Sequence, residues 1–484
     1  MDTAFWSATR LMRALRTKKI GALELLDLYA ERIARHDRAL NSLCLLDFDA
    51  ARKRARAFDR KSRRVGAKSA PLAGLPMTVK ESFDLSGHPT TWGLAEYKNT
   101  RAATDAIAVE RFARAGANVF GKSNVPTLLA DWETDNPVYG RTVNPWDASR
   151  TPGGSSGGAA AALAAGLTGL EIGSDIGGSI RNPANYCGVY GHKPTWGICS
   201  MAGHALPDSA HPADISAIGP LARSAFDLEL ALSIMGGPDA IDGAGWKLAL
   251  REPAKKTLRG LRVAVLATHP TAETDVTVQA AIGRLAQFLA RKGAKLSERT
   301  LPAFDLGEAH RVFIQLLRGA TSGRQTPEFI AQMLAAKQKL DPTDGSYYAQ
   351  MVRANTQTHK DWLAASNRRH QMRVAWAEFF RDWDVLLCPN AATAAFPHSM
   401  PGERWERMIT VNRKPQPATT QMWWAGIAGM CFLPGTAAPI GLSPGGLPIG
   451  VQIVGPQHGD LTTIRVAQLL EREYYAFVPP PAFA

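Results

Sequence analysis

The chain has 484 residues, 45% hydrophobic and 20% charged, a balance that excludes an intrinsically disordered protein and allows a sizeable core. Its five cysteines are odd in number and widely spaced, with no Cys-x-x-Cys pair, which favours a reducing compartment, the cytoplasm, over a disulfide scaffold. The net charge is +13, and residues 1–70 supply most of it, with 17 Lys or Arg against 8 Asp or Glu.

This basic N-terminal segment, residues 1–70, is predicted to be helical. Leu25, Tyr29 and Ile33 fall on one stripe of a helix over residues 22–36, opposite Glu and Arg. A basic surface can serve nucleic acid or an acidic membrane, but charges that alternate with apolar residues at helical spacing favour a solvated helix face. We therefore expect no nucleic-acid partner. The first residues show no basic run followed by an apolar core, so no secretion signal is expected.

From residue 70 onwards, short apolar runs alternate with helical periodicity, which is typical of an α/β protein. The segment 275–380 is predicted to be mostly helical, and the sequence contains no internal repeat. Strands are expected at residues 75–79, 117–120, 169–172, 262–266, 385–387 and 449–454, and helices at residues 105–115 and 156–167.

The longest uncharged stretch, residues 425–442, is about as long as a membrane-spanning helix. Pro434, Pro439 and several glycines would leave its backbone groups unpaired in lipid. We predict that this stretch belongs to a protein core or a site wall, and that the chain has no membrane span.

Two serines in Gly-rich clusters stand out as chemically placed. They lie in Pro152-Gly-Gly-Ser155-Ser-Gly-Gly158 and in Ser174-Asp-Ile-Gly-Gly-Ser179, and neither has a histidine close by in the sequence. A serine hydroxyl needs a base to become a nucleophile. Lys80 closes the apolar run Gly74-Leu-Pro-Met-Thr-Val-Lys80, a predicted buried strand that would deliver its amine into a low-dielectric interior. These residues indicate a hydrolase that uses two serines and a lysine.

The two glycines before Ser179 allow several consecutive amides to point at one spot, as an oxyanion site requires. The amides of Ile176, Gly177, Gly178 and Ser179 are the candidate donors. The same letters also fit a tight turn that Pro183 ends. The first cluster likewise fits a flexible linker, although it runs straight into an Ala-rich helix, as a loop that feeds a helix N-terminus would.

Two other motifs give rival interpretations. Gly116-Ala-Asn-Val-Phe-Gly-Lys122-Ser123 matches a phosphate-binding loop, but a helix is predicted before it and Pro126 opposes a helix after it. Gly153-Gly-Ser155-Ser-Gly157 matches a nucleophile elbow, but the preceding residues 144–152 contain almost no apolar run that could form the buried strand of an elbow. Neither context favours its motif.

The sequence resembles the amidase signature family of serine hydrolases. The motifs that carry the resemblance span most of the chain: Gly74-Leu-Pro-Met-Thr-Val-Lys80, Gly121-Lys-Ser-Asn124, Tyr139-Gly-Arg-Thr-Val-Asn-Pro-Trp146, Gly153-Gly-Ser-Ser-Gly-Gly158, Gly173-Ser-Asp-Ile-Gly-Gly-Ser-Ile-Arg-Asn-Pro-Ala184, Cys187-Gly-Val-Tyr-Gly-His-Lys-Pro-Thr195 and Gly446-Leu-Pro-Ile-Gly-Val-Gln-Ile-Val-Gly455.

The resemblance implies one large α/β domain over residues 1–484, with a mixed, twisted central sheet covered by helices on both faces. Within it, residues 71–200 would form the catalytic core and residues 270–430 a variable, mostly helical pocket region. It also implies a small-molecule amide as substrate, no cofactor and no metal. The chain could form a homodimer.

The resemblance assigns a role to each matching position. Ser179 is the expected nucleophile, Ser155 the bridging serine in a cis peptide, and Lys80 the base. Support of the glycine turn is expected from Ser156, Asp175 and Arg181. The implied reaction hydrolyses an amide through an acyl-enzyme, and burial must lower the pKa of Lys80 for that lysine to accept a proton near neutral pH.

Two alternatives within the family stay open: a hydrolase of carbamates or esters, and the amidase subunit of a tRNA-dependent amidotransferase. Those subunits usually continue from Lys-Pro-Thr with a Tyr-Gly-Arg-Val-Ser-Arg type segment, whereas this chain has Trp196-Gly-Ile-Cys-Ser-Met201. The departure favours a free-standing amidase.

Large side chains outside the shared motifs are the candidate walls of an apolar, aromatic acyl pocket. We predict Trp132, Trp423 and Trp424 as pocket residues, although each taken singly also fits a core position. Further large side chains in the unmatched segments are Trp405, Met408 and Phe432.

Overall fold

Eight strands form the central sheet of the computed structural model, which describes residues 2–62, 70–207, 209, 213–398 and 402–484. Neighbouring strands are antiparallel from β4 through to β9 and parallel from β9 to β8, so the sheet is mixed. The strand order is β4 (Glu171–Asp175), β6 (Ala217–Ala222), β5 (Tyr190–Lys193), β12 (Gly435–Leu442), β13 (Pro448–Val454), β9 (Val385–Pro389), β7 (Arg262–Val265) and β8 (Lys295–Ser297).

A smaller sheet adjoins the central one at β4. It has the order β1 (Leu43–Leu46), β3 (Asn118–Ser123) and β2 (Pro76–Lys80). Its edge strand β2 lies beside β4, where Thr78 Oγ1 donates to Glu171 Oε1 at 2.5 Å. Lys80, the last residue of β2, is thereby brought to the edge of the central sheet. A separate hairpin is formed by β10 (Met408–Val411) and β11 (Lys414–Pro417).

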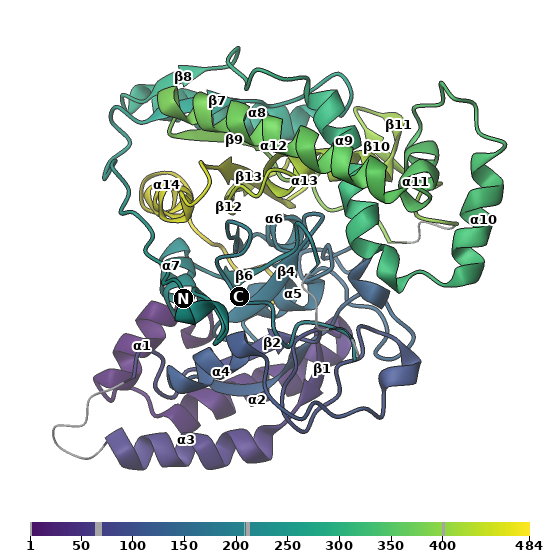
Figure 1. The fold of residues 1–484 in the computed structure, drawn as a ribbon. Helices are drawn as coiled ribbons and strands as arrows, with labels where there is room; N and C mark the ends of the chain where they lie inside the picture. Colours follow the sequence, from purple (N-terminus) through teal and green to yellow (C-terminus); the bar gives the residue numbers. More distant parts are fainter. Residues whose placement is uncertain (1, 63–69, 208, 210–212, 399–401) are drawn as a thin grey trace.

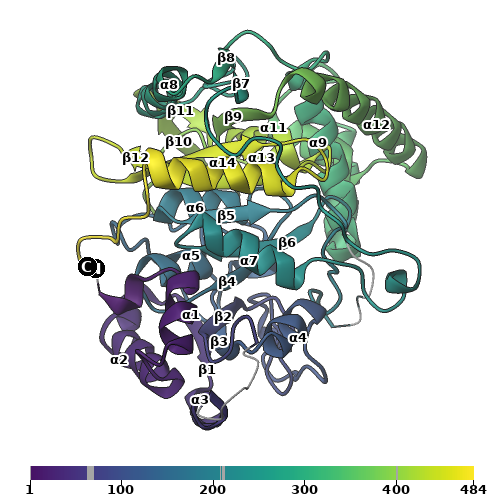
Figure 2. The same cartoon turned by 90° about the vertical axis from the view of Figure 1, so that its left-hand side faces the viewer.

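Helices cover both faces of the central sheet (Figures 1 and 2). One face carries α7 (Ala225–Met235), α8 (Val276–Arg291) and α14 (Asp460–Glu473). The other carries α5 (Gly157–Ala164), α6 (Arg181–Cys187), α9 (Leu306–Thr321), α12 (His359–Asp382) and α13 (Gln421–Gly429). The remaining helices are α1 (Ala8–Arg16), α2 (Ala22–Leu40), α3 (Phe48–Ser62) and α4 (Ile107–Arg114) around the smaller sheet, α11 (Tyr347–Asn355) beside α9, and α10 (Pro327–Lys337) packed on α11.

Strand β9 shows why two helical layers are needed. Val385 and Leu387 belong to the hydrophobic cluster that includes α8 and α14. Leu386 and Cys388 belong to the cluster that includes α9, α12 and α13. Because successive side chains of a strand point to opposite faces, a strand that is apolar throughout requires cover on both sides.

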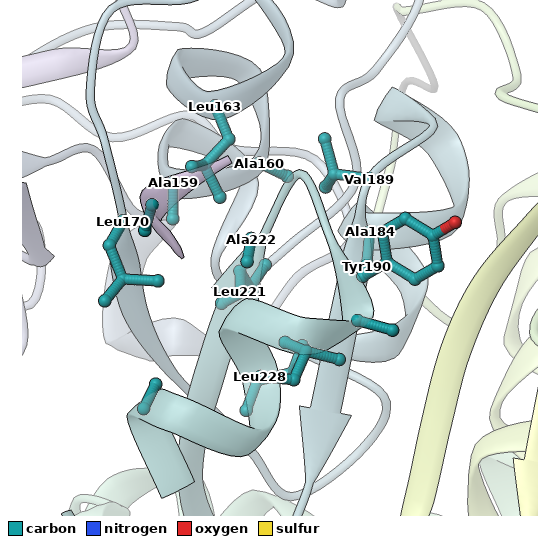
Figure 3. Packing of buried hydrophobic residues seen from close by; sticks show 14 of the residues in the cluster. Ala159, Ala160, Leu163, Leu170, Ala184, Val189, Tyr190, Leu221, Ala222 and Leu228 are labelled. Atoms are coloured by element: carbon teal, nitrogen blue, oxygen red, sulfur yellow. The ribbon is translucent and has the colours of Figure 1, made fainter. Parts of the chain in front are cut away.

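The Ala-rich helix α5 packs closely against the central sheet (Figure 3). Ala159, Ala160 and Leu163 lie on one side of β6, near Leu221, while Leu228 of α7 lies on the other side. All eight residues of α5, two glycines among them, are buried. Small side chains let this helix approach the strands, and α5 begins directly after the Ser155 cluster.

The structure confirms an α/β fold with a mixed sheet between helices. Each predicted strand overlaps a real one, and each predicted helix is present with shifted ends, such as Ile107–Arg114 for the expected 105–115. The sequence analysis missed β1, β5, β6, β8, β10, β11 and β12. Strand β1 interrupts the expected helical segment 1–70, of which residues 1 and 63–69 lie outside the described residues. The variable segment 270–430 likewise contains residues 399–401, which are not described.

The uncharged stretch 425–442 forms most of α13 and strand β12, and nearly all of it is buried. In the described part of the chain, none of the helices combines the length and the apolar character needed to cross a bilayer.

Candidate active site

Lys80 lies at the centre of a buried hydrogen-bond cluster. Its Nζ donates to Ser155 Oγ at 2.7 Å and to Ser174 Oγ at 2.9 Å, and the lysine is fully buried. Strand β2 supplies the lysine, the turn before α5 supplies Ser155 and strand β4 supplies Ser174. The structure therefore joins the predicted lysine directly to the first of the two predicted serines.

Burial controls the charge of this lysine. Desolvation lowers the pKa of Lys80 to about 7, against the opposing attraction of Asp175, Glu171 and Glu81. Burial also raises the pKa of Glu171, to about 8. Lys80 is consequently poised to gain or lose a proton near neutrality.

Ser155 is held in a cramped turn. The peptide bond between Gly154 and Ser155 is cis. A β-carbon at Gly154 would lie 2.3 Å from the carbonyl oxygen of Asp131, so no larger residue fits there. Next along the chain, the Ser156 amide donates to the Ser179 carbonyl at 3.1 Å, and the Ser156 hydroxyl lies 3.4 Å from both the amide nitrogen and the carbonyl oxygen of Ser174. Ser156 therefore links the two Gly-rich clusters.

A buried ion pair organises the glycine turn that carries Ser179. Asp175 accepts hydrogen bonds from the amides of Gly178 at 2.9 Å, Ile180 at 3.1 Å and Arg181 at 3.3 Å. Although burial acts to raise it, the adjacent Arg181 guanidinium holds the pKa of Asp175 at about 2. Gly178 has φ +97°, a conformation that glycine adopts readily. Asp175 and Arg181 thus contact each other and the glycine turn, and their role in supporting that turn stays a prediction of the resemblance.

The candidate oxyanion donors differ in availability. The Gly178 amide is engaged by Asp175. Within the described residues, the amides of Ile176, Gly177 and Ser179 donate no hydrogen bond. These three amides are therefore free to meet a developing negative charge.

A cavity opens beside the two serines. Ser155, Ser174 and Ser179 line it. Its apolar wall includes Trp92, Trp132, Ile176, Leu317, Phe396 and Met422. The indole of Trp132 donates to the Gly177 carbonyl at 3.0 Å, which couples this wall to the glycine turn. Within the described residues, no hydrogen bond joins the hydroxyls of Ser155 and Ser179, although both serines face this space.

The pocket prediction needs a correction for two tryptophans. Trp132 lines the cavity, whereas Trp423 and Trp424 do not. Both are buried in the core shared by α9, α12 and α13, where Trp423 also stacks on His269. Met422, one position earlier on α13, is the residue of that helix that reaches the cavity. Of the other large side chains, Trp405 lines the cavity, Met408 is exposed and Phe432 is in the core.

The sequence analysis missed several residues of this site. Ser174 stands inside a quoted motif, two residues after Ile172 and hence on the same face of β4 as that residue, but a lone serine on a strand gives no signal of its own. Four cavity arginines, Arg318, Arg324, Arg404 and Arg407, lie far along the chain from both serines. The last six residues of the rival phosphate-loop motif form strand β3 (Asn118–Ser123), and the buried Lys122 donates to the Pro89 carbonyl at 2.6 Å.

Comparison with known proteins decides the family. A family model described as Amidase matches residues 24–464. The chain belongs to the amidase signature family. A curated relative, the indoleacetamide hydrolase of Bradyrhizobium diazoefficiens, is 32% identical over 96% of this chain and 86% of its own length. A glutamyl-tRNA(Gln) amidotransferase subunit of Anaeromyxobacter sp. is also 32% identical, over 96% of this chain and 95% of its own.

Among solved structures, the peptide amidase of Stenotrophomonas maltophilia is similar, with a TM-score of 0.74, 26% identity and 98% of both chains covered. Membership in the amidase signature family makes this chain an amide hydrolase, and Lys80, Ser155 and Ser179 all lie within the range that the family model matches.

Proposed function

We propose that this chain hydrolyses the C–N bond of a carboxylic amide through an acyl-enzyme on Ser179, with Ser155 as the bridging serine and Lys80 as the base. The observation that carries the proposal is the 2.7 Å contact between Lys80 Nζ and Ser155 Oγ, buried beside the cavity that Ser179 also lines. A base held in low dielectric can be neutral near pH 7 and can then accept a proton.

The steps follow from these contacts. Neutral Lys80 takes the Ser155 proton, Ser155 takes the Ser179 proton, and Ser179 Oγ attacks the carbonyl carbon. The free amides of the glycine turn stabilise the oxyanion. Ser155 then protonates the leaving nitrogen as the C–N bond breaks and recovers a proton from Lys80, which is neutral again. Water repeats the sequence on the acyl-enzyme and releases the acid. Bound substrate brings the serine hydroxyls together, since catalytic hydrogen bonds often tighten only in the complex.

The proposed substrate class is an amide with an apolar or aryl group. The aromatic and aliphatic wall formed by Trp92, Trp132 and Met422 supports it, as does the name of the indoleacetamide hydrolase relative. Esters and carbamates present the same electrophilic carbonyl, so the same residues could hydrolyse them.

A second candidate is the amidase subunit of a tRNA-dependent amidotransferase, which the Anaeromyxobacter relative favours. This candidate is disfavoured by one segment of the sequence, Trp196-Gly-Ile-Cys-Ser-Met201, which departs from the segment usual in those subunits. Glutamine hydrolysis that depends on added partner subunits and charged tRNA would favour this candidate over a free-standing amidase.

The test is a panel of primary amides, anilides, esters and carbamates, assayed with wild type, Ser179→Ala and the control Ser233→Ala. Ser233 is exposed on α7, away from the cavity. We expect wild type and the control to release acid from aryl amides and Ser179→Ala to lose the activity. Full turnover by Ser179→Ala would refute the nucleophile assignment. A trapped mass increase on Ser179, equal to the acyl group, would identify the intermediate.

A further inference from the structure

The cavity beside the two serines has an uneven charge. Among the described residues that line it, four arginines face one carboxylate, Asp131. Asp131 is already paired with Arg407, at 2.9 Å between Nη1 and Oδ2. The other three arginines, Arg318, Arg324 and Arg404, have no carboxylate within ion-pair distance in the described part of the chain.

These three side chains are held by neutral groups. The Arg318 guanidinium donates to the Tyr347 hydroxyl, and its Nε is buried without a partner among the described residues. Arg404 donates to the Ala130 carbonyl. The Arg324 guanidinium stacks over the Trp92 ring at 4.3 Å. Each arginine keeps donors that neither the carbonyls nor the carboxylates of the described residues use.

The arginines are also partly removed from water, which makes their positive charges harder to accommodate side by side. Burial lowers the pKa of Arg404, and the positive charge of Arg318 lowers it further. Burial likewise lowers the pKa of Arg324. Arginine stays charged in proteins, so the like charges of this group repel one another and an anion placed among them would relieve that repulsion.

The three arginines also mark where the cavity continues outwards. They line both the space beside Ser179 and an adjoining outer pocket, which Phe329, Met333 and Tyr348 line as well. Glu403 and Glu406 line the outer pocket but not the space beside Ser179. The positive group therefore lies where the space beside Ser179 meets the outer pocket.

We infer that Arg318, Arg324 and Arg404 bind a carboxylate carried by the substrate at a position remote from the scissile amide. The inference rests on the proposed function and narrows its substrate class to amides with an apolar body and a terminal acid. Arginine suits this task because its planar donors match carboxylate geometry and remain charged at any physiological pH.

The test compares ligands of one shape and three charges. Each ω-carboxyalkanamide in a series of increasing chain length is matched with the neutral alkanamide and the ω-aminoalkanamide of the same length. Calorimetric dissociation constants are measured on Ser179→Ala, which needs no turnover, and kcat/KM is measured on wild type. At one or more lengths we expect the acid to bind about tenfold or more tighter than the neutral amide and the amine to bind weakest. The same order is expected in kcat/KM.

Three variants test whether these arginines cause the tighter binding of the acid ligands. Arg324→Gln removes a charge from the group, Arg324→Lys keeps the charge, and Arg311→Gln removes an exposed charge on α9 that does not line the cavity. The ratio of acid to neutral affinity should fall about tenfold in Arg324→Gln, fall less in Arg324→Lys and stay unchanged in Arg311→Gln. The inference would be overturned if acid and neutral ligands bound with equal affinity at all lengths, or if neither bound. The proposed function fails by a different result, which is turnover that does not depend on Ser179.

Discussion

The Arg181 guanidinium binds the Asp175 carboxylate through two hydrogen bonds, from Nη2 to Oδ1 at 2.7 Å and from Nε to Oδ2 at 2.9 Å. Both side chains are almost fully buried. The same guanidinium donates to the Ala425 carbonyl and to Gln452, which ties the glycine turn of Ser179 to α13 and β13. The turn that carries the proposed nucleophile is thus fixed by an ion pair inside the protein.

Replacing this carboxylate should destabilise the fold. In Asp175→Asn the buried Arg181 charge loses its partner, so we expect the free energy of unfolding to fall by about 3–5 kcal/mol in urea denaturation. The control is Asp135→Asn, which breaks the more exposed pair with Arg141 and should cost less than about 1 kcal/mol. Equal losses in the two variants would show that burial of the Asp175 pair has no energetic weight.

The rate profile should report the base. Lys80 must be neutral to accept a proton, and its pKa is about 7. We expect kcat/KM of wild type to fall about tenfold for each pH unit below that value, because only the neutral fraction reacts. Lys80→Met should lose most activity at all pH values with the fold retained by circular dichroism. An acidic limb near the ordinary pKa of a carboxyl group would point to a different base.

The lowered pKa of Lys80 should also make the free energy of unfolding depend on pH. The folded pKa of Lys80, about 7, lies below the ordinary lysine value of 10.5, so between these two pH values the unfolded chain binds more protons than the folded one. Stability contributed by this residue therefore rises with pH across that window. We expect the unfolding free energy of wild type to gain on that of Lys80→Met as the pH rises from about 7 to about 10. A difference that stays constant would mean that the lysine is charged in the folded protein.

Trp132 should control the preference for bulky substrates. Its ring lines the cavity and its indole nitrogen holds the Gly177 carbonyl. We expect Trp132→Ala to lower kcat/KM for an aryl amide by more than about tenfold, and that for acetamide by less, since acetamide makes little contact with the wall. Trp132→Phe should fall between. Trp246→Ala, at a partly exposed site away from the cavity, serves as control. If kcat/KM fell equally for both amides, the role of Trp132 would be to hold the glycine turn and not to bind the aryl group.

The lysine and the first serine could be predicted because local patterns mark them. Lys80 ends an apolar run that can only be a buried strand, and Ser155 stands where a Gly-rich loop enters a helix of small residues. Asp175 and Arg181 were singled out by the resemblance as residues beside the glycine turn, because both lie within one continuous motif, but their ion pair was not predicted. In each case a short segment of chain marks the residue, although the contact between Lys80 and Ser155 joins segments far apart in the sequence.

The cavity wall could not be predicted in this way. Successive residues of a helix point about 100° apart, so the choice between Met422 and Trp423 depends on how α13 is rotated against α9, which only tertiary packing fixes. Arg318 and Arg404 come from α9 and a distant loop, and no spacing in the sequence shows that they meet. Strand β12 was not predicted because Pro439 and its glycines are residue types that are uncommon inside strands. In the structure, β5 and β13 pair with it on either side.

Helix α5 has a consequence for how this enzyme can change. Its alanines pack against the central sheet (Figure 3) directly after the turn that carries Ser155, while Lys80 is held by the smaller sheet. An extra methylene on the sheet-facing side of α5 would lift the serine away from the amine without touching either residue. In a mutational scan, α5 should therefore tolerate few substitutions without loss of turnover, although it contributes no chemical group to the site. Directed evolution of substrate specificity should instead select changes in α9 and α13.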